Sequence, residues 1–158
     1  MRLKALLLLA GGGVVLRALL GLWPSLALVS DPMLVLAVLA ALPGRMDRAL
    51  GAAVLAGILQ DAWLGRWYGE FAFIYLVVVF FLSLFAGWVD LVRPLSTILA
   101  LAAATVASWG LQLGLSAAFD HPVADLPGAG VWLGAMAVNV VLGLLARPVV
   151  RRLKGYES

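Results

Sequence analysis

The chain has 158 residues, of which 65% are hydrophobic and 12% charged, and its mean hydropathy is +1.10. A soluble domain of this size leaves much of its surface in solvent, so these proportions exclude a single soluble core and predict an integral membrane protein. The net charge of +3 would suggest nucleic-acid binding in a soluble chain, but here the basic residues lie between apolar runs and at the chain ends, which indicates membrane topology instead.

Apolar runs follow one another along the chain and predict an all-α bundle of about six transmembrane helices with no soluble domain. A cleaved signal peptide is an alternative interpretation of the first run, because basic residues precede it. The predicted runs cover residues 6–22, 33–42, 50–64, 71–89, 95–119 and 131–145.

The second run is unusually short. Asp31 and Pro32 interrupt the apolar pattern before it, and Pro32 suits the first turn of a helix. The run from Met33 to Leu42 has about half of the ~20 residues that a spanning helix needs. It is therefore a short tilted span, a re-entrant element, or the end of a span that begins near Leu26.

The positive charges predict an orientation with six crossings and both termini in the cytoplasm. Only Arg66 then faces outward and Arg17 falls within a run, while nine of the eleven basic residues lie inside: Arg2, Lys4, Arg45, Arg48, Arg93, Arg147, Arg151, Arg152 and Lys154. This bias would be lost if the second run did not cross, so it favours a crossing. We expect Arg45, Arg48 and the C-terminal basic residues to contact anionic lipid or cytoplasmic partners.

A stripe of small residues accompanies a carboxylate in the third run. Four residues recur at every fourth position and share one face of a helix: Gly57, Asp61, Gly65 and Gly69. Gly130 and Gly134 repeat this spacing in the last run. Small residues so spaced let membrane helices approach closely, either inside the bundle or toward a partner protein.

Arg17 and Asp61 are the formal charges deepest in apolar sequence. At 1.5 Å per residue, each lies roughly 18 to 20 Å from the inner end of its run, so a buried ion pair between them is predicted. In the alternative interpretation, Arg17 reaches toward the outer interface and Asp61 caps or neighbours a loop.

The remaining polar residues favour helix packing over catalysis. Asn139, Gln60 and Gln112 are expected to form hydrogen bonds between helices rather than to bind a substrate, and Ser108, Gln112 and Ser116 share a face. The one histidine, His121, lies in a loop with two carboxylates, too few ligands for a metal centre. With no cysteine and no histidine near the serines, we expect neither an enzyme nor a cofactor.

One segment carries a recognisable combination of these features. Pro32 opens a short apolar run, a small polar turn follows, Gly57 and Asp61 stand four apart in the sequence GILQD, further glycines come near Gly65 and Gly69, and Tyr75 lies in an aromatic helix. In these features residues 31–75 resemble the rod shape-determining protein MreD family, which the chain also resembles in total length and in its basic tail.

The resemblance implies a non-enzymatic, multi-pass subunit of the bacterial inner membrane. Such a protein would bind the bitopic protein MreC and support MreB filaments and the elongation transglycosylase and transpeptidase, and the glycine stripe and outer loops would meet MreC. A second possibility is similarity to the substrate-binding subunits of energy-coupling-factor vitamin transporters. In that case an outward cavity would be lined by Asp61, Gln60, Gln112, Trp67 and the His121 loop.

Overall fold

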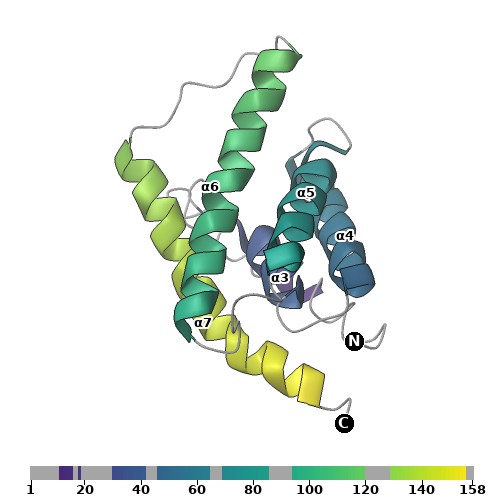
Figure 1. Cartoon of the computed structure of the whole chain (residues 1–158), viewed down its shortest axis with the longest axis vertical. Helices are drawn as coiled ribbons and strands as arrows, with labels where there is room; N and C mark the ends of the chain where they lie inside the picture. Colours follow the sequence, from purple (N-terminus) through teal and green to yellow (C-terminus); the bar gives the residue numbers. More distant parts are fainter. Residues whose placement is uncertain are drawn as a thin grey trace.

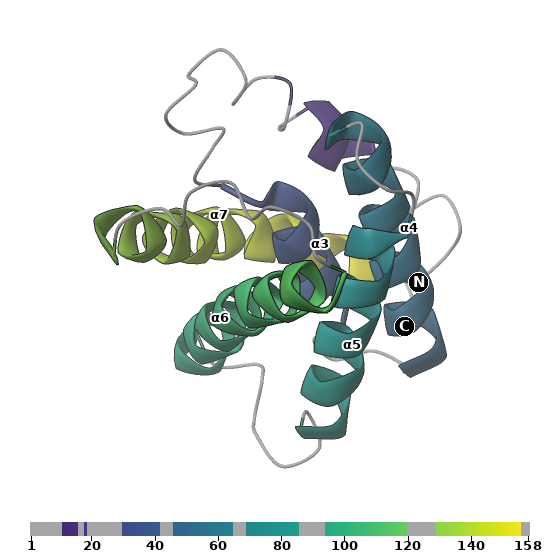
Figure 2. The same ribbon diagram turned by 90° about the horizontal axis from the view of Figure 1, so that it is seen from above.

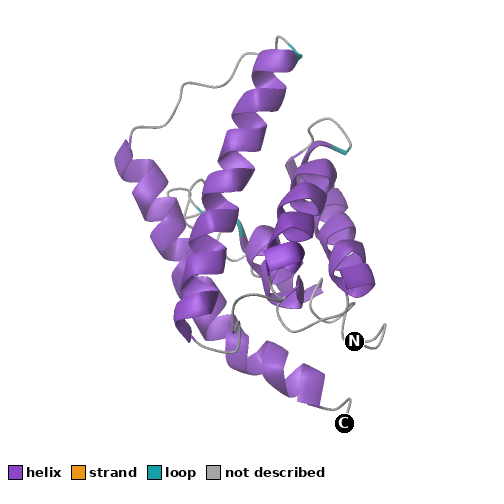
Figure 3. Ribbon diagram, viewed as in Figure 1, coloured by secondary structure: helices purple, strands orange, loops and turns teal. Residues whose placement is uncertain are grey.

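The computed structural model describes residues 11–15, 18, 30–41, 46–64, 69–85, 94–119 and 129–155. In this part of the chain all regular structure is helical, which confirms the predicted all-α class (Figure 3). The helices are α3 (Pro32–Ala41), α4 (Met46–Leu64), α5 (Glu70–Phe85), α6 (Pro94–Ala118) and α7 (Ala129–Gly155), and a short helical segment covers residues 11–15.

Two helices are long and apolar enough to cross a membrane. They are α6, with 25 residues, and the 21-residue part of α7 from Gly130 to Val150. At 1.5 Å per residue each exceeds the ~30 Å hydrocarbon core of a bilayer. The helices α3 and α5 are apolar but shorter.

The helices form two pairs with α3 between them (Figures 1 and 2). The helices α4 and α5 lie side by side in one pair, and α6 and α7 form the other and diverge toward the C-terminal end of α6. Near the start of α7, Trp132 still contacts Trp109 of α6 edge to face, with ring centroids 4.3 Å apart. The helix α3 contacts all four of its neighbours and connects the two pairs.

The helix α3 is apolar on every face, which is typical of a helix buried among others. Nine of its ten residues are buried. A ten-residue helix reaches about 15 Å, half of the hydrocarbon thickness, so α3 alone does not cross a bilayer. The first residues of a longer span that begins near Leu26 lie outside the described part of the chain.

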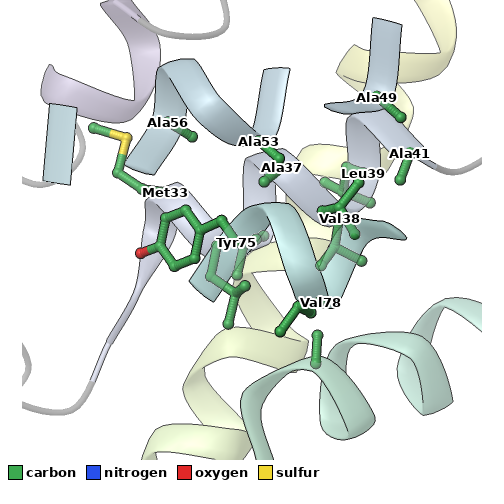
Figure 4. Packing of buried hydrophobic residues seen from close by; sticks show 14 of the residues in the cluster. Met33, Ala37, Val38, Leu39, Ala41, Ala49, Ala53, Ala56, Tyr75 and Val78 are labelled. Carbon is green, nitrogen blue, oxygen red and sulfur yellow. The ribbon is translucent and has the colours of Figure 1, made fainter. Parts of the chain in front are cut away.

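The core is built where large side chains of α3 and α5 meet small ones of α4 (Figure 4). Met33 and Val38 of α3 and Tyr75 of α5 are 2% exposed or less. The helix α4 contributes alanines and glycine at close spacing, which lets its neighbours pack against its backbone. Its buried residues are Ala49, Ala52, Ala53, Ala56, Gly57, Gln60 and Asp61.

Large apolar side chains cover the outer faces of α5, α6 and α7. The most exposed are Phe73, Phe81, Leu84 and Phe85 on α5, Leu95, Leu99 and Val106 on α6, and Leu133, Val141, Leu145 and Val149 on α7. Exposed apolar side chains in such numbers indicate contact with lipid or with another protein.

Candidate functional site: buried polar groups between the helices

Asp61 of α4 caps the N-terminus of the neighbouring helix α5. Its carboxylate is fully buried and accepts hydrogen bonds from the backbone N–H groups of Gly69 (2.9 Å), Phe71 (2.9 Å) and Ala72 (3.3 Å). The first N–H groups of a helix have no partner within the helix, and the positive end of its dipole favours an anion. The buried charge is therefore stabilised by α5 and fixes the two helices to each other.

Gly57 lies one turn before Asp61 and brings the two helix backbones into contact. A Cβ atom at this position would overlap the backbone of Ala72 and would lie 2.7 Å from the carbonyl carbon of Phe71. No side chain fits there unless the helices separate. Gly57 and Asp61, four residues apart on one face, thus form a single joint between α4 and α5, which we call the α4–α5 joint.

The other glycines predicted as packing positions have different surroundings. Gly69 forms the turn before α5 with a φ of 109°, a conformation that favours glycine. Gly130 is exposed and has open space around its Cα, Gly134 is half-buried on α7, and Gly65 lies outside the described residues. Sequence reasoning missed Gly143 of α7, where a Cβ would overlap the side chain of Leu101.

A second group of polar residues, in which Asp31 is half-buried and Tyr75 and Asn139 are buried, gathers at the N-terminus of α3. Asp31 caps this helix, because its Oδ1 accepts a hydrogen bond from the backbone N–H of Leu34 (3.1 Å). The hydroxyl of Tyr75, from α5, lies 2.6 Å from both carboxylate oxygens of Asp31 and donates to them. The backbone N–H of Asp31 donates to Oδ1 of Asn139, on α7 (2.8 Å).

Asn139 extends these contacts to α6. Its Nδ2 donates to Oγ1 of Thr105 (3.2 Å), and the Thr105 hydroxyl donates to the carbonyl of Leu101 (2.8 Å). The four residues Asp31, Tyr75, Asn139 and Thr105, which we call the polar network, therefore link α3, α5, α7 and α6. Sequence reasoning expected an interhelical role for Asn139 and missed the roles of Asp31 and Thr105.

The polar network lies near the middle of the two longest helices. Thr105 is 11 residues after Pro94 and 13 before Ala118, and Asn139 is 9 residues after Gly130 and 11 before Val150. Hydrogen bonds between buried polar side chains at this depth favour one register of the helices, because each group would otherwise lack a partner.

The other polar candidates on α4 and α6 differ in their burial and in their hydrogen bonds. Gln60 is 3% exposed, and its Oε1 has no hydrogen-bond partner within the described part of the chain. Ser108 is buried and donates to the carbonyl of Thr105 (2.9 Å), whereas Gln112 and Ser116 on the same face are half-buried.

Arg17, the predicted ion-pair partner of Asp61, lies outside the described residues. The described partners of Asp61 are backbone N–H groups, and they support the alternative interpretation in which this carboxylate is a cap. Trp67 and the His121 loop, proposed as cavity residues, also lie outside the described part.

The predicted basic contact residues that the structure describes belong to α4 and α7. Arg48 is exposed in the first turns of α4 and Arg147 is half-buried on α7, while Arg45 lies outside the described residues. The last apolar run was predicted to end at Leu145, but α7 continues through Pro148 to Gly155. The helix therefore also includes Arg151, Arg152 and Lys154.

Within the described residues, no group of three or more histidine, aspartate or glutamate side chains could hold a metal ion. The described polar groups form hydrogen bonds between helices. No protein-family model, curated protein or solved structure matches this chain.

Proposed function

We propose that this protein is a non-enzymatic, multi-pass scaffold of the bacterial inner membrane that acts in cell elongation by binding a bitopic MreC-like protein. The observation that carries this proposal is the α4–α5 joint. Two of the residues on which the resemblance to the MreD family depends, Gly57 and Asp61, are those that hold two helices together. In a scaffold, these two residues of the motif would keep α4 and α5 packed together.

The distribution of polar and apolar groups supports the same proposal. Asp61 and the polar network are engaged in hydrogen bonds between helices, and the outer faces of α5, α6 and α7 are apolar. A protein whose interior polar groups are engaged and whose outer faces are apolar suits the lateral binding of other membrane helices. Through such contacts it would support the elongation transglycosylase and transpeptidase.

The proposed topology has six crossings with both termini in the cytoplasm, and the chain is suited to testing it because it contains no cysteine. Single cysteines at positions 46 and 66 would be labelled in intact cells with a reagent that does not cross the membrane. Labelling at position 66 and protection at position 46 are expected. Labelling at position 46 from outside would overturn the topology.

The partner proposal is tested by photocrosslinking in cells. Gly57 is unsuitable as a crosslinking position because α5 covers it. Exposed positions should be used instead, with Val106 on α6, Leu133 on α7 and Phe81 on α5 sampling three faces. An adduct with the MreC-like protein from one face and not from the others is expected. Failure of all three, together with failure of the purified protein to capture the partner, would refute the proposal.

The burial of Gln60 favours a second candidate function, in which the protein is a membrane subunit that binds a vitamin-sized solute. Its Oε1 is buried without a hydrogen-bond partner among the described residues, and a buried acceptor of this kind is a position at which a ligand can donate. A co-purified small molecule that Gln60→Leu abolishes would favour the transporter-like function. Native mass spectrometry of the intact protein makes this measurement.

A further inference from the structure

The face of α6 that meets α7 becomes exposed toward the C-terminal end of α6. At Thr105, which is 1% exposed, this face receives a hydrogen bond from Asn139 of α7. Gln112 and Ser116 follow Thr105 by about two and three helical turns, so they continue the same face. Both are half-buried, and α6 and α7 diverge in this direction (Figure 1).

The polar groups on the exposed part of this face are unpaired. In the part of the chain that the structure describes, neither Gln112 nor Ser116 has a hydrogen-bond partner, whereas Thr105 and Ser108 below them donate to backbone carbonyl groups. Gln112 lies six residues, or about 9 Å, before the end of α6 at Ala118, within the apolar span. Its amide can donate two hydrogen bonds and accept others, and lipid tails offer no group that could form them.

Apolar side chains are exposed at the diverging ends of both helices. Phe119 at the end of α6 and Leu133 near the start of α7 are 67% and 62% exposed. Transmembrane helices associate by packing apolar and small side chains and by a few hydrogen bonds between polar ones. Unpaired polar groups within an apolar surface at membrane depth therefore fit another transmembrane helix.

We propose that Gln112 and Ser116 form the contact site for the single transmembrane helix of the bitopic partner. That helix would pack against α6 where α7 has diverged, and a polar side chain in it would form a hydrogen bond with the amide of Gln112. The site rests on the scaffold function proposed above and names the surface that this function uses. Hydrogen-bond complementarity selects the occupant, because an acyl chain would cover the apolar surface but leave the amide unpaired.

The first test measures capture of the MreC-like protein by full-length variants in detergent. Gln112→Leu removes the amide and should weaken capture by about three- to tenfold, as expected for one hydrogen bond between membrane helices. Gln112→Asn keeps an amide and should bind more tightly than Gln112→Leu. Ser116→Ala should also weaken capture, and its matched control is Ser83→Ala, which removes a hydroxyl on α5 that likewise has no partner among the described residues.

Stability separates a partner contact from a role inside the bundle. Because Gln112 has no hydrogen bond within the described chain, Gln112→Leu should not lower the free energy of unfolding in sodium dodecyl sulfate. Tyr75→Phe, which removes a hydrogen bond between α5 and Asp31, should lower it and leave capture unchanged. Loss of both stability and capture in Gln112→Leu would assign the amide to internal packing and refute the site.

Photoreactive residues at positions 116 and 114 locate the contact. Two residues apart on a helix, these positions lie on opposite faces, and Gly114 is exposed with open space around it. An adduct with the partner from position 116 and none from position 114 is expected. Equal adducts from both positions, or unchanged capture by Gln112→Leu, refute the site and leave the scaffold function standing. If the natural sequence captures no MreC-like protein, the scaffold function is refuted together with this occupant.

Discussion

Replacement of Gly57 by alanine should destabilise the protein by about 2 to 4 kcal/mol. The added Cβ would lie 2.7 Å from the carbonyl carbon of Phe71 and closer still to the backbone of Ala72, whereas carbon atoms in contact are about 3.5 to 4.0 Å apart. Because these neighbours are backbone atoms, α4 and α5 must separate by roughly 1 Å. Overpacking of this kind costs about 1 to 3 kcal/mol.

The same separation of α4 from α5 weakens the hydrogen bonds by which Asp61 caps α5. Two of the bonds to Asp61 are 2.9 Å long, and a shift of about 1 Å would take them beyond hydrogen-bonding distance, adding about 1 kcal/mol. Unfolding by sodium dodecyl sulfate in detergent micelles, followed by circular dichroism, measures the free energy. Gly51→Ala is the matched control, because Gly51 lies on the same helix in open space and alanine there should be neutral or stabilising by up to about 1 kcal/mol.

This reasoning would be refuted if Gly57→Ala unfolded within about 0.5 kcal/mol of the natural sequence. Equal destabilisation by the Gly51 and Gly57 variants would also refute it, because Gly51 lies in open space and a loss shared by both positions could not come from the contact with α5.

Three further substitutions test the other contacts by the same measurement. Asp61→Ala leaves three backbone N–H groups without their acceptor and should cost about 3 to 5 kcal/mol. Tyr75→Phe removes only the hydroxyl that donates to Asp31 and should cost about 1 to 2 kcal/mol without changing the helix content. Gly143→Ala should cost about 1 kcal/mol, less than Gly57→Ala, because the atoms it meets belong to the side chain of Leu101, which can move.

Each of these expectations has an outcome that contradicts it. Asp47→Ala, an exposed carboxylate in the first turn of the same helix, should change the stability by less than about 1 kcal/mol; a cost equal to that of Asp61→Ala would remove the special role of the cap. A Tyr75→Phe protein as stable as the natural one would show that the polar network does not contribute to stability. A Gly143→Ala variant less stable than Gly57→Ala would reverse the predicted order.

The helix positions could be predicted largely from hydrophobicity, and the deviations have a common cause. The predicted run of residues 95–119 matches α6 within one residue at each end. By contrast, α4 begins four residues before the predicted run, and α7 extends ten residues past Leu145. Apolar runs end where lipid contact ends, but arginine, lysine and leucine are good helix formers and continue the helix beyond that point.

The buried contacts could be predicted only where their geometry is local. Gly57 and Asp61 stand one helical turn apart, so their shared face is evident from spacing alone. Asp31 and Asn139 are 108 residues apart, and their contact depends on how α3 packs against α7, which no short pattern encodes. The sequence therefore indicated only that Asp31 interrupts an apolar run, whereas the structure shows it at the centre of the polar network.

The short length of α3 affects how the chain inserts into the membrane during synthesis. A ten-residue helix is too short to partition into a bilayer as an independent span, and Asp31, the residue that caps it, donates its backbone N–H to a side chain that is synthesised 108 residues later. For a chain inserted during synthesis, the contact between Asp31 and Asn139 forms only after α7 has emerged from the ribosome. Chains that end before Asn139 should therefore fail quality control in the membrane, even though they contain the complete α4–α5 joint.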